Sequence, residues 1–168
     1  MGKTKMKRGQ VHRAFVEQFS FPPLERPAPV THSALLAVEE SLTTTFPSSY
    51  LSFLVEHGPI FTPDILPLMV AAHEVGGSPE KEGFDVREFF PPAEIVRTYS
   101  LYVSGGMDHS LIPFAMDSGG SVFGFRREKI EVRPDDAPVL FFDHDYCQIR
   151  PEADSFDAWL EGFLGLKA

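Results

Sequence analysis

The stretch that decides the fold is SLIPFAMDSGGSVFGFR, residues 110–126. An apolar run ends at Asp117, the residues SGGS follow, and a second apolar run begins at Val122. Two apolar runs joined by a glycine-rich turn predict a β-hairpin. Pro113 has no N–H to donate to a β-ladder, so we expect it at a sheet edge, at a bulge or near the start of its strand.

A third apolar run, VLFF at residues 139–142, lies between the acidic segments DDAP (135–138) and DHD (143–145). Three short consecutive strands predict an antiparallel meander, and we expect helices to pack against one face of it. Residues 65–72 are also apolar enough for a strand, which Pro67 would restrict to an edge or to its first residues.

Apolar residues recur at helical spacing in several other segments. The C-terminal segment is the clearest, because its cap and first-turn acids precede an apolar stripe that contains Trp159. The helices expected from such spacing cover 11–21, 31–42, 47–57, the stretch between Pro92 and Gly105, and 154–164. The fold class is therefore α+β: a single domain with a central, mostly antiparallel sheet, flanking helices and a C-terminal amphipathic helix.

The charge is distributed unevenly along the 168 residues, which carry a formal net charge of −9. Five of the fifteen basic residues fall within the first thirteen positions, and no acid precedes Glu17. We divide the chain into a basic arm with a proline-rich lead-in (1–30) and an α+β domain (31–168), and expect 1–10 to be a mobile, solvated arm. The strongly acidic remainder disfavours nucleic acid and favours a basic partner.

The single cysteine, Cys147, cannot form an internal disulfide, which favours a cytoplasmic setting. No apolar stretch approaches the roughly 18 residues that a membrane-spanning helix requires. We therefore expect no membrane association.

Four segments in the same order resemble the SUKH superfamily, which includes the Syd and Smi/Knr-like proteins. They are FPSSYLSFL (46–54), IPFAMDSGG (112–120), residues 139–145 and SFDAWL (155–160). Together they extend the likeness over about 31–166.

The chain departs from that family pattern at two places. His57-Gly58-Pro59 stands where an Asn-Gly-Gly-like end of the second helix is usual, and Ser121 stands where Asp or Asn often follows the hairpin glycines. The connector 61–110 matches no part of the pattern.

The resemblance implies an α+β domain that binds other proteins and does not catalyse a reaction. Bacterial relatives resemble immunity proteins that neutralise toxins, often nucleases, and fungal relatives act as interaction hubs in cell-wall regulation. We expect an immunity protein whose partner is a basic toxin domain. The expected contact is an acidic edge, with the 76–83 loop as a candidate second contact. That edge comprises Asp135, Asp136, Asp143, His144 and Asp145.

Two alternatives stay open. One is a metal-dependent hydrolase that uses Asp117, Asp143, His144 and Asp145, since carboxylates and imidazole bind divalent metals. Side-chain alternation directs His144 away from the two flanking aspartates, and aspartates in turns usually bond their own backbone. We therefore expect no metal, no cofactor and no catalytic residue. The other alternative is a scaffold or regulator in a cell-envelope pathway, with several weak partners.

Overall fold

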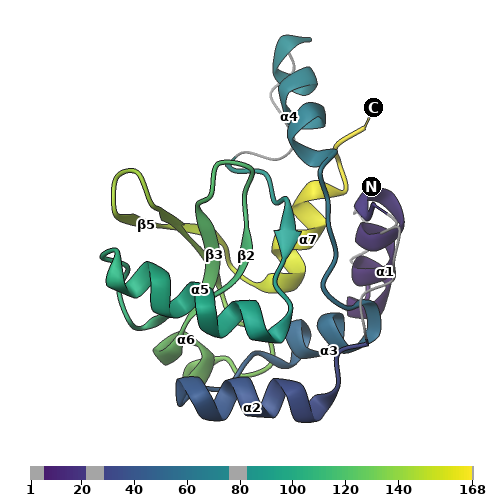
Figure 1. The fold of residues 1–168 in the computed structure, drawn as a ribbon. Helices are drawn as coiled ribbons and strands as arrows, with labels where there is room; N and C mark the ends of the chain where they lie inside the picture. The colour runs from purple at the N-terminus through teal and green to yellow at the C-terminus, as the bar shows by residue number, and fades with distance from the viewer. Residues whose placement is uncertain (1–5, 22–28, 76–82, 168) are drawn as a thin grey trace.

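The computed structural model describes residues 6–21, 29–75 and 83–167 (Figure 1). The helices are α1 (Arg8–Phe19), α2 (His32–Leu42), α3 (Ser48–His57), α4 (Ile65–Glu74), α5 (Pro92–Ser104), α6 (Arg127–Val132) and α7 (Phe156–Phe163). The strands are β1 (Glu88–Phe89), β2 (Leu111–Met116), β3 (Val122–Arg126), β4 (Val139–Asp143) and β5 (Gln148–Ala153). The α+β prediction is confirmed.

The five strands form one sheet in the order β1-β2-β3-β4-β5, and each strand is antiparallel to the next. The predicted hairpin is β2 and β3, and the predicted third strand is β4. The sequence did not predict β5, because this strand is short of large apolar residues and contains Pro151. These features are typical of an edge strand, where they discourage pairing with other chains.

The β2–β3 pair contains a bulge. Pro113 pairs with Gly124 but Ala115 pairs with Phe123, so Phe114 is an extra residue. Of the three positions expected for Pro113, the structure shows the one at a bulge. A Cβ atom on Gly124 would lie 2.6 Å from the carbonyl oxygen of Ile112, so only glycine fits opposite this part of β2.

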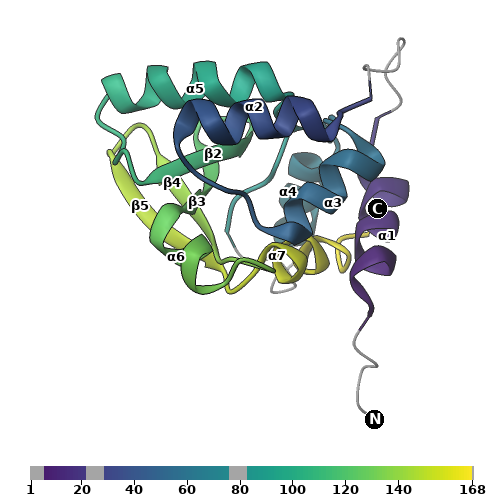
Figure 2. The ribbon, with the colours of Figure 1, turned by 90° about the horizontal axis from the view of Figure 1, so that it is seen from below.

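Helices cover both faces of the sheet, and the expectation of one covered face is wrong (Figure 2). On one face Trp159 of α7 packs against Phe123, with ring centroids 4.8 Å apart. On the other, Tyr102 of α5 packs against Phe142, with centroids 6.2 Å apart. The central strands are apolar at nearly every position, so both of their faces must be shielded from water.

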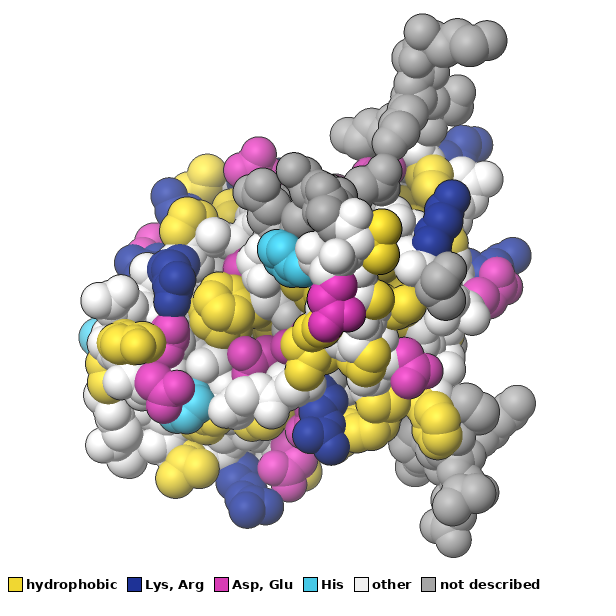
Figure 3. All heavy atoms as spheres, turned by 90° about the horizontal axis from the view of Figure 1, so that it is seen from above, with side chains coloured by type: hydrophobic (Ala, Val, Ile, Leu, Met, Phe, Trp, Pro, Cys, Tyr) yellow, Lys and Arg dark blue, Asp and Glu magenta, His cyan; other side chains and the backbone are white. Residues whose placement is uncertain are grey.

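Residues 65–72 are helical, and the prediction of a strand is wrong. Pro67 is the third residue of α4, where a helical N–H has no partner within the helix, so proline is tolerated there. Ile65 and Met69 are buried while Pro67 between them is exposed, which fits a helix because a strand would direct all three side chains to the same face. In Figure 1, α4 projects from the end of the molecule, and Figure 3 views that end.

Helix α1 begins within the segment predicted to be a mobile arm. Arg8, Gly9 and Gln10 form its first turn, so that prediction is wrong for these residues. Residues 1–5 of the predicted arm lie outside the described residues. None of the helices that the structure describes is both long enough and apolar enough to span a bilayer.

We predict that Gly124→Ala destabilises the fold by about 1–3 kcal/mol, the usual range for overpacking, because the new methyl group would collide with backbone. Urea denaturation measures this loss. The matched control is Gly119→Ala in the adjoining turn, where the nearest atom would be an ordinary 3.5 Å away and a smaller loss is expected. Equal losses for the two variants would contradict the steric explanation.

Candidate functional site: an acidic junction between three helices

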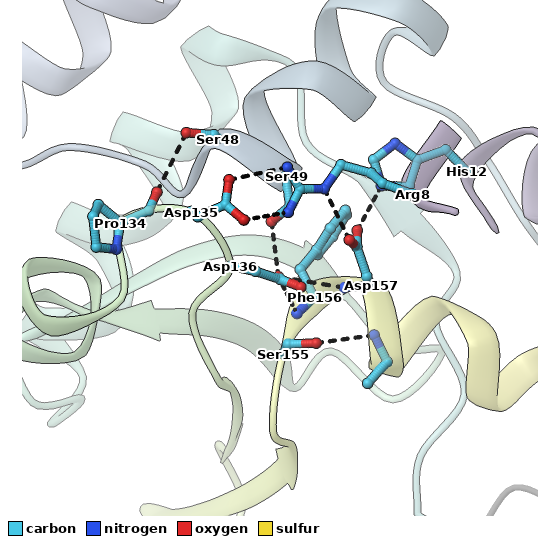
Figure 4. Close-up of polar contacts among 11 residues, drawn as sticks. Arg8, His12, Ser48, Ser49, Pro134, Asp135, Asp136, Ser155, Phe156 and Asp157 are labelled. Atoms are coloured by element: carbon cyan, nitrogen blue, oxygen red, sulfur yellow. Dashed lines mark hydrogen bonds and ion pairs between the residues drawn. The ribbon is translucent and has the colours of Figure 1, made fainter. Parts of the chain in front are cut away.

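The loop between α6 and β4 supplies acceptors to the start of α3 (Figure 4). The N–H of Ser48 donates to the carbonyl oxygen of Pro134 at 3.0 Å, and the N–H of Ser49 donates to that of Asp135 at 2.9 Å. The residue at the N-cap of α3 is Pro47, whose side chain cannot accept a hydrogen bond. The loop therefore satisfies N–H groups that a helix start leaves without partners.

Asp136 joins the start of α3 to the start of α7. Its Oδ1 atom accepts hydrogen bonds from the Ser49 hydroxyl at 2.8 Å and from the backbone N–H of Phe156 at 2.9 Å. The sequence predicted a cap within 154–157, and the structure shows that the N-cap of α7 is Ser155, whose hydroxyl accepts from the N–H of Ala158 at 3.1 Å. A carboxylate is favourable here because a helix N-terminus carries partial positive charge.

Helix α1 is attached to the same junction through Arg8 (Figure 4). Its guanidinium donates to both carboxylate oxygens of Asp135, at 3.1 and 2.8 Å, and to Asp157 at 2.9 Å. The other oxygen of Asp157 lies 2.8 Å from Nε2 of His12, whose side chain is 1% exposed. One arginine and one histidine of α1 thus meet two carboxylates from distant parts of the chain.

These contacts perturb the ionisation of the junction. The hydrogen bond from Arg8 lowers the pKa of Asp135 below its usual value, and the same contact raises the pKa of Arg8. Burial acts to raise the pKa of Asp157, but the hydrogen bonds from His12 and Arg8 outweigh it and lower that pKa. Both carboxylates therefore favour the charged form in the folded protein.

The structure does not gather the five acidic-edge residues into one place. Asp135 and Asp136 precede β4, whereas Asp143, His144 and Asp145 lie at its other end. A five-residue strand separates the two groups by about 17 Å, at about 3.3 Å per residue. The role of these residues in partner binding stays a prediction.

At the far end of β4, Asp143 is held by its neighbours. Its side chain is 10% exposed and lies 2.5 Å from a guanidinium nitrogen of Arg150. It also accepts hydrogen bonds from the N–H groups of Asp145 and Tyr146, as expected for an aspartate in a turn. In contrast, the carboxylate of Asp145 is 75% exposed.

His144 and Asp117 meet through the β2–β3 turn. The Nδ1 atom of His144 lies 3.0 Å from the hydroxyl of Ser121, and the carboxylate of Asp117 accepts from the N–H groups of Gly119 at 2.9 Å and Ser121 at 2.7 Å. Burial raises the pKa of Asp117, and the nearby Asp85 raises it further. Within 6–21, 29–75 and 83–167, no three His, Cys, Asp or Glu side chains are placed to share a metal ion.

Sequence reasoning missed the partners of these acids. The only local signals at the junction were the serine pair at 48–49 and the capping pattern of α7. Arg8 was assigned to a mobile arm, but it contacts Asp135 directly. The two residues are 127 positions apart in the sequence. Such long-range ion pairs leave no periodic pattern from which they can be found.

The family model described as SMI1 / KNR4 family (SUKH-1) matches residues 29–162, well over half of the chain. The chain belongs to the SMI1 / KNR4 family. The match includes α3, the loop that contacts the N-termini of α3 and α7, and all of α7 except its last residue, whereas helix α1 lies outside it. In this member of the SMI1 / KNR4 family, α1 packs against α3 and α7 of the matched region. Among proteins of curated function, none is similar enough to count as a match.

We predict that Arg8→Met lowers the free energy of unfolding at pH 7 by about 1–3 kcal/mol, because hydrogen-bonded carboxylates lose their partner. A depressed folded pKa stabilises the protein above the unfolded pKa of about 3.9, and this stabilisation is lost as the pH falls through the folded pKa. The deficit of the variant should therefore shrink below about pH 4.

Urea denaturation of both proteins at pH 7 and pH 3 tests this dependence. The matched control is Arg97→Met, since Arg97 is 76% exposed and forms an i,i+3 pair with Glu94. Pairs of this kind contribute only about 0.3–0.5 kcal/mol. A deficit for Arg8→Met that is the same at both pH values would contradict an ionic origin.

We predict the opposite behaviour for Asp117. Its raised pKa means that its charge is unfavourable in the folded state, so the stability is greatest below the unfolded pKa and falls as the pH rises through the folded value. Asp117→Asn keeps an acceptor for Gly119 and Ser121, and its stability at pH 7 should equal or exceed that of the wild type. Asp117→Ala removes the acceptor and should cost about 1–3 kcal/mol. Equal losses for the two variants in urea denaturation would show that the charge itself is needed.

Proposed function

We propose that this chain is a non-enzymatic immunity protein, which neutralises a toxin by binding directly to it. The observation that carries the proposal is the SMI1 / KNR4 family match over 29–162. The likeness to this superfamily implies protein binding in both its bacterial and its fungal branches. The acidic composition of the domain favours the immunity role.

The arrangement of the candidate acid-base residues supports binding over catalysis. Asp143 is paired with Arg150, and Asp117 accepts hydrogen bonds from its own turn. Ser121 and His144 contact each other, and the N–H of His144 also donates to the Ser121 hydroxyl at 3.2 Å. These contacts hold together the ends of two hairpins, so they stabilise the fold.

The charge of the chain supports a basic partner. A formal net charge of −9 repels nucleic acid and speeds encounter with a positively charged protein. A toxin that cleaves nucleic acid needs a basic face to bind phosphates, and an acidic domain competes for that face. We propose the acidic residues around β4 as the contact, with Asp145 presenting the freer carboxylate at the β4–β5 turn.

The experiment is a pull-down from native lysate with the full chain, washed at low and at high salt, followed by calorimetry with the recovered partner. We expect one stoichiometric basic protein that is lost as the salt concentration rises. Several weak partners would instead favour a scaffold or regulator.

We predict that Asp145→Lys weakens binding to that partner about tenfold in low salt, and that the affinity of the variant depends less on salt. The change reverses an exposed charge without breaking a buried contact, so folding should be unaffected. Glu40→Lys, on an exposed position of α2, is the control with the same charge change. If both variants bind like the wild type at every salt concentration, the acidic turn is not part of the contact.

A further inference from the structure

Helix α4 carries an exposed apolar face on an element that projects from the molecule (Figures 1 and 3). Ile65 and Met69 anchor the helix, with 0% and 6% of their surface exposed. On the outside, Leu66 is 40% exposed and Val70 is 48% exposed. Leu66 and Val70 are four positions apart, so they lie next to each other on one face.

The composition of α4 is unusual for a helix at a protein surface. Residues 65–72 contain no charged side chain, whereas a surface helix normally presents charged residues on its outer face. Val75, immediately after the helix, is 87% exposed. Five positions correspond to about 140° round a helix, so Val75 lies off the face that Leu66 and Val70 form. The adjacent pair Leu66 and Val70, on a projecting element, is therefore the candidate interaction site.

The charges around α4 indicate which chemistry would cover it. Asp64 and Glu74 lie at the two ends of the apolar face, and both are exposed. The described segment 29–75 contains no lysine and no arginine. A complementary surface would therefore be apolar at its centre and basic at its rim.

We propose that α4 inserts the face formed by Leu66 and Val70 into an apolar groove of a protein partner, and that Lys or Arg side chains at the rim of the groove pair with Asp64 and Glu74. Docking of an amphipathic helix into a groove is a common mode of protein recognition. A second copy of this chain is a poorer occupant, because its own α4 would bring like charges together. This proposal rests on the proposed function and adds an apolar contact to the acidic contact proposed around β4.

The 76–83 loop that the sequence proposed as a second contact follows α4 directly. Apart from Gly83, it lies outside the described residues. The surface defined here does not depend on that loop.

The first test is photo-crosslinking of the full chain in its native cells, with benzoylphenylalanine in place of Val70. The control position is Leu36, which is 55% exposed on α2, at the opposite end of the molecule in Figure 1. We expect an adduct at position 70 and none at position 36, with a crosslinked peptide that contains apolar residues and Lys or Arg. No adduct at position 70, adducts at both positions, or crosslinks only between copies of this chain would overturn the proposal.

The second test compares Val70→Asp with Leu36→Asp in calorimetry against the protein that the crosslink identifies. Both positions are exposed, and circular dichroism verifies that both variants fold. We expect Val70→Asp to raise the Kd at least tenfold, or about 1.4 kcal/mol, and Leu36→Asp to leave it within about twofold. If the partner binds Val70→Asp as tightly as it binds the wild type, the proposal that α4 is a contact surface is wrong. The proposed function is not affected by that result. Failure of the proposed function would appear instead as the absence of any stoichiometric partner in the pull-down.

Discussion

The hydrogen bonds of Asp136 hold together the two helices that cover one face of the sheet. A single carboxylate oxygen accepts from Ser49 at the start of α3 and from Phe156 at the start of α7. Each of these helix ends has N–H groups that need acceptors, and burying them without partners would cost about 1–3 kcal/mol for each group. Carbonyl groups of the same loop accept hydrogen bonds from further N–H groups at the start of α3. The position of both helices thus follows from one short loop.

The aromatic core depends on this geometry. Phe156, at the first position of α7, lies within 5.7 Å of the rings of Tyr50, Phe53 and Phe114, measured between centroids. These rings come from α3, α7 and the bulged strand β2, so a shift of either helix would separate them. Ring pairs of this kind contribute about 0.5–1.5 kcal/mol each beyond their buried area. Asp136 is therefore a polar residue whose main effect is on apolar packing.

How well each feature could be predicted depended on whether its signal was local. The β2–β3 hairpin and the cap of α7 were predicted correctly because their signals, the turn residues and the spacing of apolar residues, lie within short segments of the sequence. Residues 65–72 were assigned wrongly because a short apolar run fits either a strand or a helix, and it is the exposure of Pro67 between the buried Ile65 and Met69 that distinguishes them. The pairing of Arg8 with Asp135 and Asp157 spans most of the chain, so no window of sequence contains it.

An acidic composition is different from an acidic surface. Arg8 pairs with both Asp135 and Asp157, and Arg150 pairs with Asp143, so these carboxylates stabilise the fold and part of their charge is balanced. Other carboxylates are exposed, such as Asp145, which lies 3.3 Å from Nε2 of His144, and those at the ends of α4. Charge speeds association over long distances, while apolar burial determines how long a complex lasts. A projecting apolar helix with acidic ends combines both contributions at one end of the molecule. That combination suits a binding domain that must find its target quickly and hold it.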